Sequence, residues 1–110
     1  MAIDVIKKQK DAIQLAIRDE MTIYTALEQK QQLTEYLKSG RQIQVDLAGV
    51  TEIDSAGLQL LMFIKQESTR QGIQFTMVRH SEAVVEVLEL LDLVTHFGDP
   101  IVISADWTSS

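Results

Sequence analysis

Cysteine is absent from the 110-residue sequence, which excludes disulfide bonds and thiolate chemistry. This absence is compatible with a reducing cytoplasm, the location that we expect for the protein. Long apolar runs are also missing, since the run at residues 60–64 is far shorter than the ~20 residues that a membrane-spanning helix needs. The first residues show neither a basic leader nor a long apolar stretch, so we expect neither a membrane span nor a secretion signal.

Positive charge is scarce. The chain has 10 Lys and Arg residues against 16 Asp and Glu residues, which gives a net charge of −6. Proteins that bind nucleic acids hold the phosphate backbone with clustered cations, so this class of function is not expected. The only basic cluster consists of Lys7, Lys8 and Lys10, and we interpret it as part of a solvated leader.

Catalytic and metal-binding motifs are missing as well. The sequence has no phosphate-binding loop of the Gly-x-x-x-x-Gly-Lys type and no Gly-x-Ser-x-Gly turn. His80 and His96 form no pair with metal-ligand spacing, so we predict no zinc site and place both histidines at the surface or at loop caps. Nothing in the spacing supplies a base for a serine nucleophile. We therefore predict no enzymatic activity, no cofactor and no metal.

A phosphoacceptor domain of the response-regulator kind is a more serious alternative, because Asp46 ends a predicted central strand. Domains of that kind also use a lysine after a late strand, whereas the last lysine here is Lys65, inside a predicted helix. We therefore interpret Asp46 and Asp54 as acids that order turns or cap a helix by accepting hydrogen bonds from backbone N–H groups.

The spacing of apolar residues predicts strands that alternate with helices. The expected elements are a hairpin over 13–24, a helix over 26–39 that starts with a capping box at Thr25 and Glu28, a strand over 42–47, a helix over 55–70, a strand over 73–78, a helix from Ser81 and an edge strand over 101–103. This order predicts an α/β fold with a mixed sheet of four to five strands and helices packed on it. We expect a single domain over 1–110 with its core over 12–97, and loose ends at 1–10 and 104–110.

Ser55 lies where the central strand and its loop give way to the second long helix. The first turn of a helix presents unpaired backbone N–H groups and the positive end of the helix dipole, which favours a phosphate group. Ser55 is therefore a candidate phosphorylation site. The alternative is that Ser55 or Asp54 merely caps the helix, and the two roles are compatible.

The segment around Ser55 resembles the signature of STAS domains, the modules found in sulfate transporters and anti-sigma factor antagonists. The resemblance rests on the run Asp-Ser-Ala-Gly-Leu at residues 54–58, which follows a strand that ends in Asp46 and Leu47. The order of strands and helices extends it to roughly residues 12–97, and the single-domain antagonist type fits the chain length.

The resemblance implies a regulatory protein-interaction module. In antagonists of this type, a partner serine kinase that is also the anti-sigma factor phosphorylates the serine in the position of Ser55. The unphosphorylated form binds that partner and frees the sigma factor; phosphorylation breaks the binding, and a phosphatase restores it. By this resemblance Ser55 is the acceptor, and its motif neighbours Asp54, Ala56 and Gly57 contact the partner. We expect a monomer or a weak dimer.

The second helix adds candidate contacts of its own. Successive residues turn by about 100°, which predicts an outward stripe with Ser55, Gln59, Met62 and Phe63 and an opposite, buried stripe over residues 60, 61 and 64. Gln59, Met62 and Phe63 are therefore further candidates for partner binding. The alternative is that Met62 and Phe63 pack under a neighbouring helix or loop.

The two glycines of this region have separate interpretations. Gly57 either leaves the approach to Ser55 open or makes a tight contact with an adjoining strand. Gly49 is expected in a loop, at a positive backbone angle.

Two other functions remain open. The chain is alternatively a constitutive STAS subunit that docks on the ATPase of a lipid-transport ABC system, where Ser55 is a fixed contact. A third possibility is a scaffold in chemotaxis or stress signalling in which phosphorylation gates another partner. Neighbouring genes for an anti-sigma kinase, a transporter ATPase or a chemotaxis cluster would each select one of the three.

Overall fold

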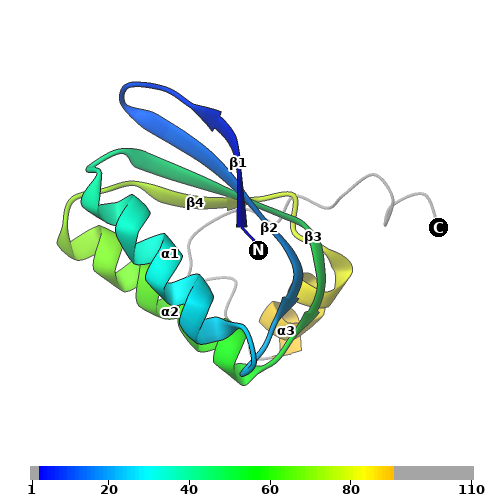
Figure 1. Cartoon of the computed structure of the whole chain (residues 1–110). Coiled ribbons are helices and arrows are strands. Elements are labelled where there is room, and N and C mark those ends of the chain that lie inside the picture. Colours follow the sequence, from blue (N-terminus) through cyan, green and yellow to red (C-terminus); the bar gives the residue numbers. More distant parts are fainter. Residues whose placement is uncertain (1–2, 91–110) are drawn as a thin grey trace.

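The structure is a computed structural model that describes residues 3–90. Its elements are β1 (Ile3–Lys8), β2 (Ala12–Met21), α1 (Ala26–Lys38), β3 (Gln42–Ile53), α2 (Ser55–Arg70), β4 (Phe75–Val78) and α3 (Glu82–Leu90). The four strands form one sheet in the order β1-β2-β3-β4. β1 is antiparallel to β2, while β2, β3 and β4 are mutually parallel. The predicted α/β architecture with a mixed sheet is confirmed (Figure 1).

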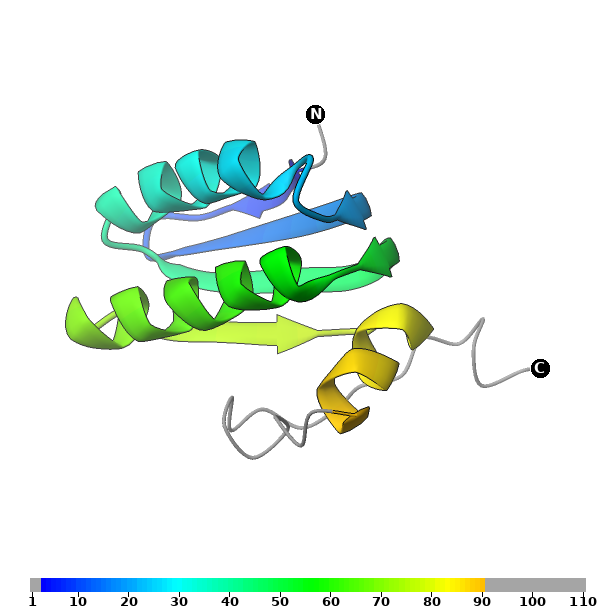
Figure 2. The ribbon, with the colours of Figure 1, turned by 90° about the horizontal axis from the view of Figure 1, so that it is seen from below.

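α1 and α2 lie side by side across one face of the sheet, whereas α3 sits apart from them near the C-terminal half of β3 (Figures 1 and 2). The core between the two helices and the sheet is built from side chains at alternate strand positions and from one stripe of each helix. Its members include Ile13, Leu15, Ile17, Leu33, Leu37, Ile43, Val45, Leu47, Leu60, Leu61 and Ile64. Each such side chain contributes about 1.5–3 kcal/mol by leaving water, so the second helix is held firmly in place.

The N-terminal segment differs from the expectation of a loose leader. Residues 3–8 form β1, which pairs with β2 through a short turn, and Ile3 is buried. The predicted hairpin over 13–24 is wrong, because β2 continues through Asp19 to Met21 as a single strand. Asp19 takes a positive φ of 65° beside a register shift in the β2–β3 ladder, so the acidic pair of residues 19 and 20 marks an irregular strand and not a turn.

β3 is longer than predicted, since it runs past Leu47 to Ile53 beside β2. The expectation that Gly49 lies in a loop at a positive φ is also wrong: Gly49 pairs with Arg18 of β2, and the described glycines with positive φ are Gly40 and Gly72. Because β3 extends this far, Asp54 directly follows the strand and leads straight into α2.

The predicted helix over 26–39 is confirmed as α1, but its capping box is not. The Thr25 side chain makes no capping hydrogen bond; its hydroxyl donates to the carbonyl oxygen of Glu20 at 3.1 Å. Thr25 therefore ties the start of α1 back to the end of β2. Glu28, the predicted partner in the capping box, is exposed.

The C-terminal part of the described chain follows the predicted order. β4 lies within the expected strand. Ser81 directly precedes α3, and its Oγ accepts a hydrogen bond from the backbone N–H of Val84 at 3.3 Å. His80 lies in the short connection between β4 and α3, which agrees with the loop-cap alternative, but it is buried and so does not lie at the surface. Its neighbour Arg79 has a positive φ of 53°. The predictions for His96, the edge strand at 101–103 and the tail at 104–110 lie outside the described residues.

Candidate functional site

Ser55 is the first residue of α2 and lies at the end of the sheet where β3 stops. Its side chain is exposed. Among the described residues, no group forms a hydrogen bond with the Ser55 hydroxyl. The hydroxyl is therefore accessible to another molecule and contributes no bond to the fold.

Asp54 caps α2, as predicted. Its Oδ1 accepts hydrogen bonds from the backbone N–H groups of Ala56 at 2.9 Å and Gly57 at 3.2 Å. Its Oδ2 accepts a third hydrogen bond from the backbone N–H of Ile23 at 3.0 Å. One carboxylate therefore fastens the start of α2 to the segment between β2 and α1, and we call this arrangement the Asp54 clip.

Because of the clip, the negative charge on Asp54 contributes to the stability of the folded state. The hydrogen bond from the backbone N–H of Ile23 is the largest effect on the Asp54 carboxyl and lowers its pKa below the usual 3.8. Desolvation, the second effect in size, opposes this shift, and the N–H groups of Gly57 and Ala56 add smaller contributions that lower the pKa. A group whose pKa is lower in the folded state stabilises the fold above its unfolded pKa, and this stabilisation disappears as the pH falls through the folded pKa.

Replacing Asp54 with asparagine is expected to lower the melting temperature. The asparagine oxygen can still cap α2, but its amide cannot accept a hydrogen bond from Ile23. The difference in melting temperature between wild type and Asp54→Asn should be constant well above pH 3.8 and should shrink below it, where the wild-type carboxylate becomes protonated. Thermal unfolding across this pH range measures the difference; a gap that stays the same in acid contradicts the clip.

Gly57 is buried in a close contact between α2 and β2. A Cβ atom at this position would overlap the carbonyl oxygen of Met21 and lie 2.8 Å from the carbonyl carbon and the Cβ of Met21. The interpretation that Gly57 opens the approach to Ser55 is therefore wrong, and the alternative of a tight contact with a strand is confirmed. Gly57 faces the interior and offers no surface to a partner.

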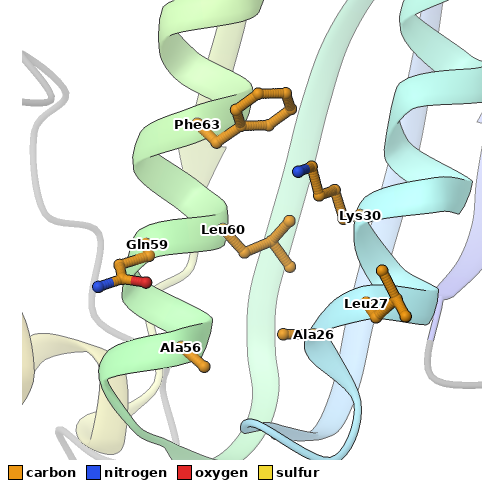
Figure 3. Close-up of a pocket in the computed structure, with 7 residues that line it drawn as sticks. All are labelled: Ala26, Leu27, Lys30, Ala56, Gln59, Leu60 and Phe63. Carbon is orange, nitrogen blue, oxygen red and sulfur yellow. The ribbon is translucent and has the colours of Figure 1, made fainter.

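The outward stripe of α2 is partly covered by the protein itself. Leu60, Leu61 and Ile64 are buried as predicted, and Gln59 is exposed. Phe63 is half-buried and points toward α1, where the Nζ of Lys30 lies 4.4 Å from the centre of its ring (Figure 3).

Between α1 and α2 lies a groove of about 330 Å³, which we call the interhelix groove (Figure 3). It is lined by Ala26, Leu27, Lys30, Ala56, Gln59, Leu60 and Phe63. Ala56 lines the groove and directly follows Ser55, so the groove lies next to Ser55 at the first turn of α2. Met62 lies on the other flank of α2, against Lys65, Gln66 and Thr69. The structure therefore brings Ala56, Gln59 and Phe63 together beside Ser55 and separates Met62 from them.

Three exposed apolar residues near this site are not among the candidates that the sequence indicates. Ile23, Tyr24 and Leu27 are exposed by 70%, 88% and 70%. The first two lie within the predicted hairpin over 13–24, and this prediction gives no sign of their exposure. Leu27 offered a signal, because it lies off the stripe that buries Leu33 and Leu37 in α1.

Asp46 has a structural role. Its Oδ1 accepts a hydrogen bond from the backbone N–H of Ala48 at 2.8 Å, and its Oδ2 lies 3.2 Å from Arg79. Within residues 3–90 there is no group of three or more His, Cys, Asp or Glu side chains placed to hold a metal ion. None of the helices in the described part of the chain has the length and apolar character needed to cross a bilayer.

A family model matches the chain, and its fold is similar to that of solved structures. A model of the family described as "Mlab, STAS domain" matches residues 5–102. A putative anti-sigma factor antagonist from Thermotoga maritima has a similar structure, with a TM-score of 0.77 and 23% identity over 97% of this chain and 91% of that one. An anti-sigma factor antagonist from Mycobacterium paratuberculosis matches with a TM-score of 0.76 and 18% identity, covering 94% and 88% of the two chains.

The anti-sigma factor antagonist SpoIIAA in its unphosphorylated form is a third similar structure, with a TM-score of 0.68 and 11% identity over 98% of this chain and 94% of that one. At these identities the structural matches show a common fold, whereas the family model spans most of the chain. The chain belongs to the STAS domain family.

Proposed function

We propose that this chain is a non-enzymatic regulatory module of the anti-sigma factor antagonist type, which acts on transcription in the cytoplasm through a protein partner. The partner is a serine kinase that is also the anti-sigma factor. The unphosphorylated chain binds this partner with the surface around the start of α2, and phosphorylation of Ser55 ends the binding until a phosphatase restores it. The similar structures described as anti-sigma factor antagonists support this general role.

The observation that carries the proposal is the exposed Ser55 hydroxyl, which forms no hydrogen bond within residues 3–90 and lies at a helix end where the next three N–H groups are already bonded. Asp54 binds the N–H groups of Ala56 and Gly57, and the N–H of Leu58 donates to the Asp54 backbone carbonyl at 3.0 Å. A phosphate on Ser55 therefore finds few free donors in the helix and stays on the surface, adding about −1.5 to −2 charges there.

The reason why phosphorylation weakens the complex is electrostatic. To accept a phosphoryl group, the Ser55 hydroxyl has to face the terminal phosphate of a nucleotide held by the kinase. After the transfer, the phosphoserine faces the phosphates of the remaining nucleoside diphosphate. Like charges at close range cost several kcal/mol at an interface, so the modified chain dissociates.

Phosphorylation is tested with purified serine kinases from the source organism. Each kinase is incubated with the protein and ATP, and intact mass followed by peptide mapping locates any phosphate. We expect one phosphate, on Ser55, and none on Ser55→Ala. Ser39 is a useful internal control, because it is also exposed but its hydroxyl is bonded to the carbonyl oxygen of Tyr36. If every kinase that binds the chain leaves Ser55 unmodified, the proposal that phosphorylation of Ser55 controls binding is wrong.

The second candidate function is a constitutive STAS subunit of a lipid-transport ABC system. The description of the matched family names Mlab and a STAS domain and does not mention sigma regulation, so the family by itself does not select the antagonist role over this one. In that case Ser55 is a fixed contact, no kinase modifies it, and the partner is a transporter ATPase.

A further inference from the structure

Exposed apolar side chains are concentrated at the turn between β2 and α1. Six large apolar residues are exposed within residues 3–90, and three of them, Ile23, Tyr24 and Leu27, lie within five positions of the chain. We call these three residues the corner patch. Single exposed apolar residues are ordinary, but a contiguous group marks a surface that another molecule covers.

The backbone under the corner patch is fixed by hydrogen bonds. The Thr25 hydroxyl accepts from the N–H of Thr22 at 3.0 Å, and the Thr22 hydroxyl accepts from the N–H of Tyr24 at 3.3 Å. The buried Gln29 amide donates to the carbonyl oxygen of Glu20 at 3.0 Å. Thr22 itself is buried. A patch held in this way loses little conformational entropy when a partner binds, which favours affinity.

The corner patch is continuous with the Ser55 site. Leu27 belongs both to the corner patch and to the interhelix groove, which also contains Ala56 and Gln59 of α2. The Asp54 clip joins the N–H of Ile23 to the residue that precedes Ser55. The patch, the groove and the serine therefore form one surface on a rigid support.

Acidic side chains border this surface. Glu20 and Glu52 are paired across the ends of β2 and β3, where like charges disfavour each other, and Glu28 is exposed in the first turn of α1. None of the three forms an ion pair with any residue between 3 and 90. The nearby cation Lys30 lies over the Phe63 ring. Positively charged side chains of a partner would relieve the repulsion between Glu20 and Glu52.

We propose that the partner protein receives the corner patch in an apolar pocket, with Tyr24 as the anchor, and surrounds that pocket with Lys and Arg residues facing Glu20, Glu28 and Glu52. This inference deepens the proposed function, on which it rests, by assigning the partner a second contact apart from its nucleotide. A second copy of this chain would bring the same acids together, and an anionic membrane would repel them, so a basic protein surface is the occupant that the charges favour.

The partner is first identified by a photocrosslinking amino acid placed at position 24 in cells. Position 44 in β3 is the control, because it lies between the buried residues 43 and 45 and so faces the side of the sheet opposite to the core under α1 and α2. The binding kinetics of the purified partner are then measured. We expect Tyr24→Ala to weaken binding by about tenfold or more through faster dissociation, since aromatic anchors carry much of an interface's energy. Glu28→Lys should slow association and reduce its dependence on salt.

The matched control is Ile6→Thr, which removes another exposed apolar side chain, on β1. It should bind like wild type, and thermal unfolding should show that all variants remain folded. The inference is overturned if Tyr24→Ala binds within about twofold of wild type, if position 24 crosslinks to a second copy, or if the protein binds vesicles of anionic lipid through this patch. Ser55→Asp separates the two proposals. If Ser55→Asp binds the partner tightly while Tyr24→Ala binds weakly, only the proposed control by phosphorylation is contradicted. If Ser55→Asp binds weakly while Tyr24→Ala binds tightly, only the role of the corner patch is contradicted.

Discussion

Replacing Gly57 with alanine is expected to destabilise the protein by about 3 kcal/mol or more, which lowers the melting temperature by roughly 10 °C or more. Helix propensity predicts the opposite sign, since alanine is favoured over glycine inside a helix by about 0.5–1 kcal/mol. The contact outweighs the propensity because the added methyl group would overlap a backbone carbonyl, that of Met21, which cannot move without displacing β2. Chemical and thermal unfolding measure the effect.

Gly49→Ala is the control for this substitution. Gly49 also faces β2, but an added Cβ would meet the flexible side chain of Arg18, with its Cγ at 3.2 Å. That side chain can move away, so Gly49→Ala should change stability far less. Equal effects of the two substitutions would show that glycine content, and not the contact between α2 and β2, determines the loss.

Replacing Ser55 with aspartate is expected to weaken binding to the nucleotide-loaded partner by about tenfold or more while the melting temperature stays close to that of wild type. The fold should be unaffected because the Ser55 side chain is exposed and makes no hydrogen bond to any described residue. The effect should grow when the partner holds ADP or an ATP analogue, since the nucleotide phosphates provide the repulsion. Titration calorimetry with and without nucleotide measures both affinities.

Ser55→Asn provides the matched control, because asparagine has nearly the shape of aspartate without its charge. We expect Ser55→Asn and Ser55→Ala to bind within a few-fold of wild type, at roughly 1 kcal/mol or less. If Ser55→Asn loses as much affinity as Ser55→Asp, the size of the side chain is responsible and the electrostatic account of the switch is wrong.

The fold could be predicted where local patterns reflect burial. The spacing of Leu33 and Leu37 identified α1, and the alternation over residues 42–47 identified the start of β3. The sequence does not indicate β1, because Ile3 alone among its six residues is buried and the strand therefore carries no amphipathic pattern. The predicted hairpin is wrong because aspartate is common in turns, whereas Asp19 lies inside a continuous strand and takes a positive φ there.

The site could be predicted in part for the same reason. Helix capping depends on residues within one turn, so the position of Ser55 and the capping role of Asp54 were visible in the sequence. The hydrogen bond between Asp54 and Ile23 joins residues 31 positions apart, and no local pattern indicates it. The corner patch and the buried contact of Gly57 likewise depend on how α2 crosses the end of β2.

The Asp54 clip also bears on how long the protein survives in the cell. The clip holds α2 and the corner together through the carboxylate of Asp54, the residue before Ser55, so the proposed phosphorylation of Ser55 would leave the hydrogen bonds that support the fold in place. Proteases act on chains that open, and the population of open chains depends on the stability of the fold. If Ser55 is phosphorylated as proposed, the phosphorylated and unphosphorylated molecules should therefore be degraded at similar rates, and repeated cycles of phosphorylation would not deplete the pool of protein.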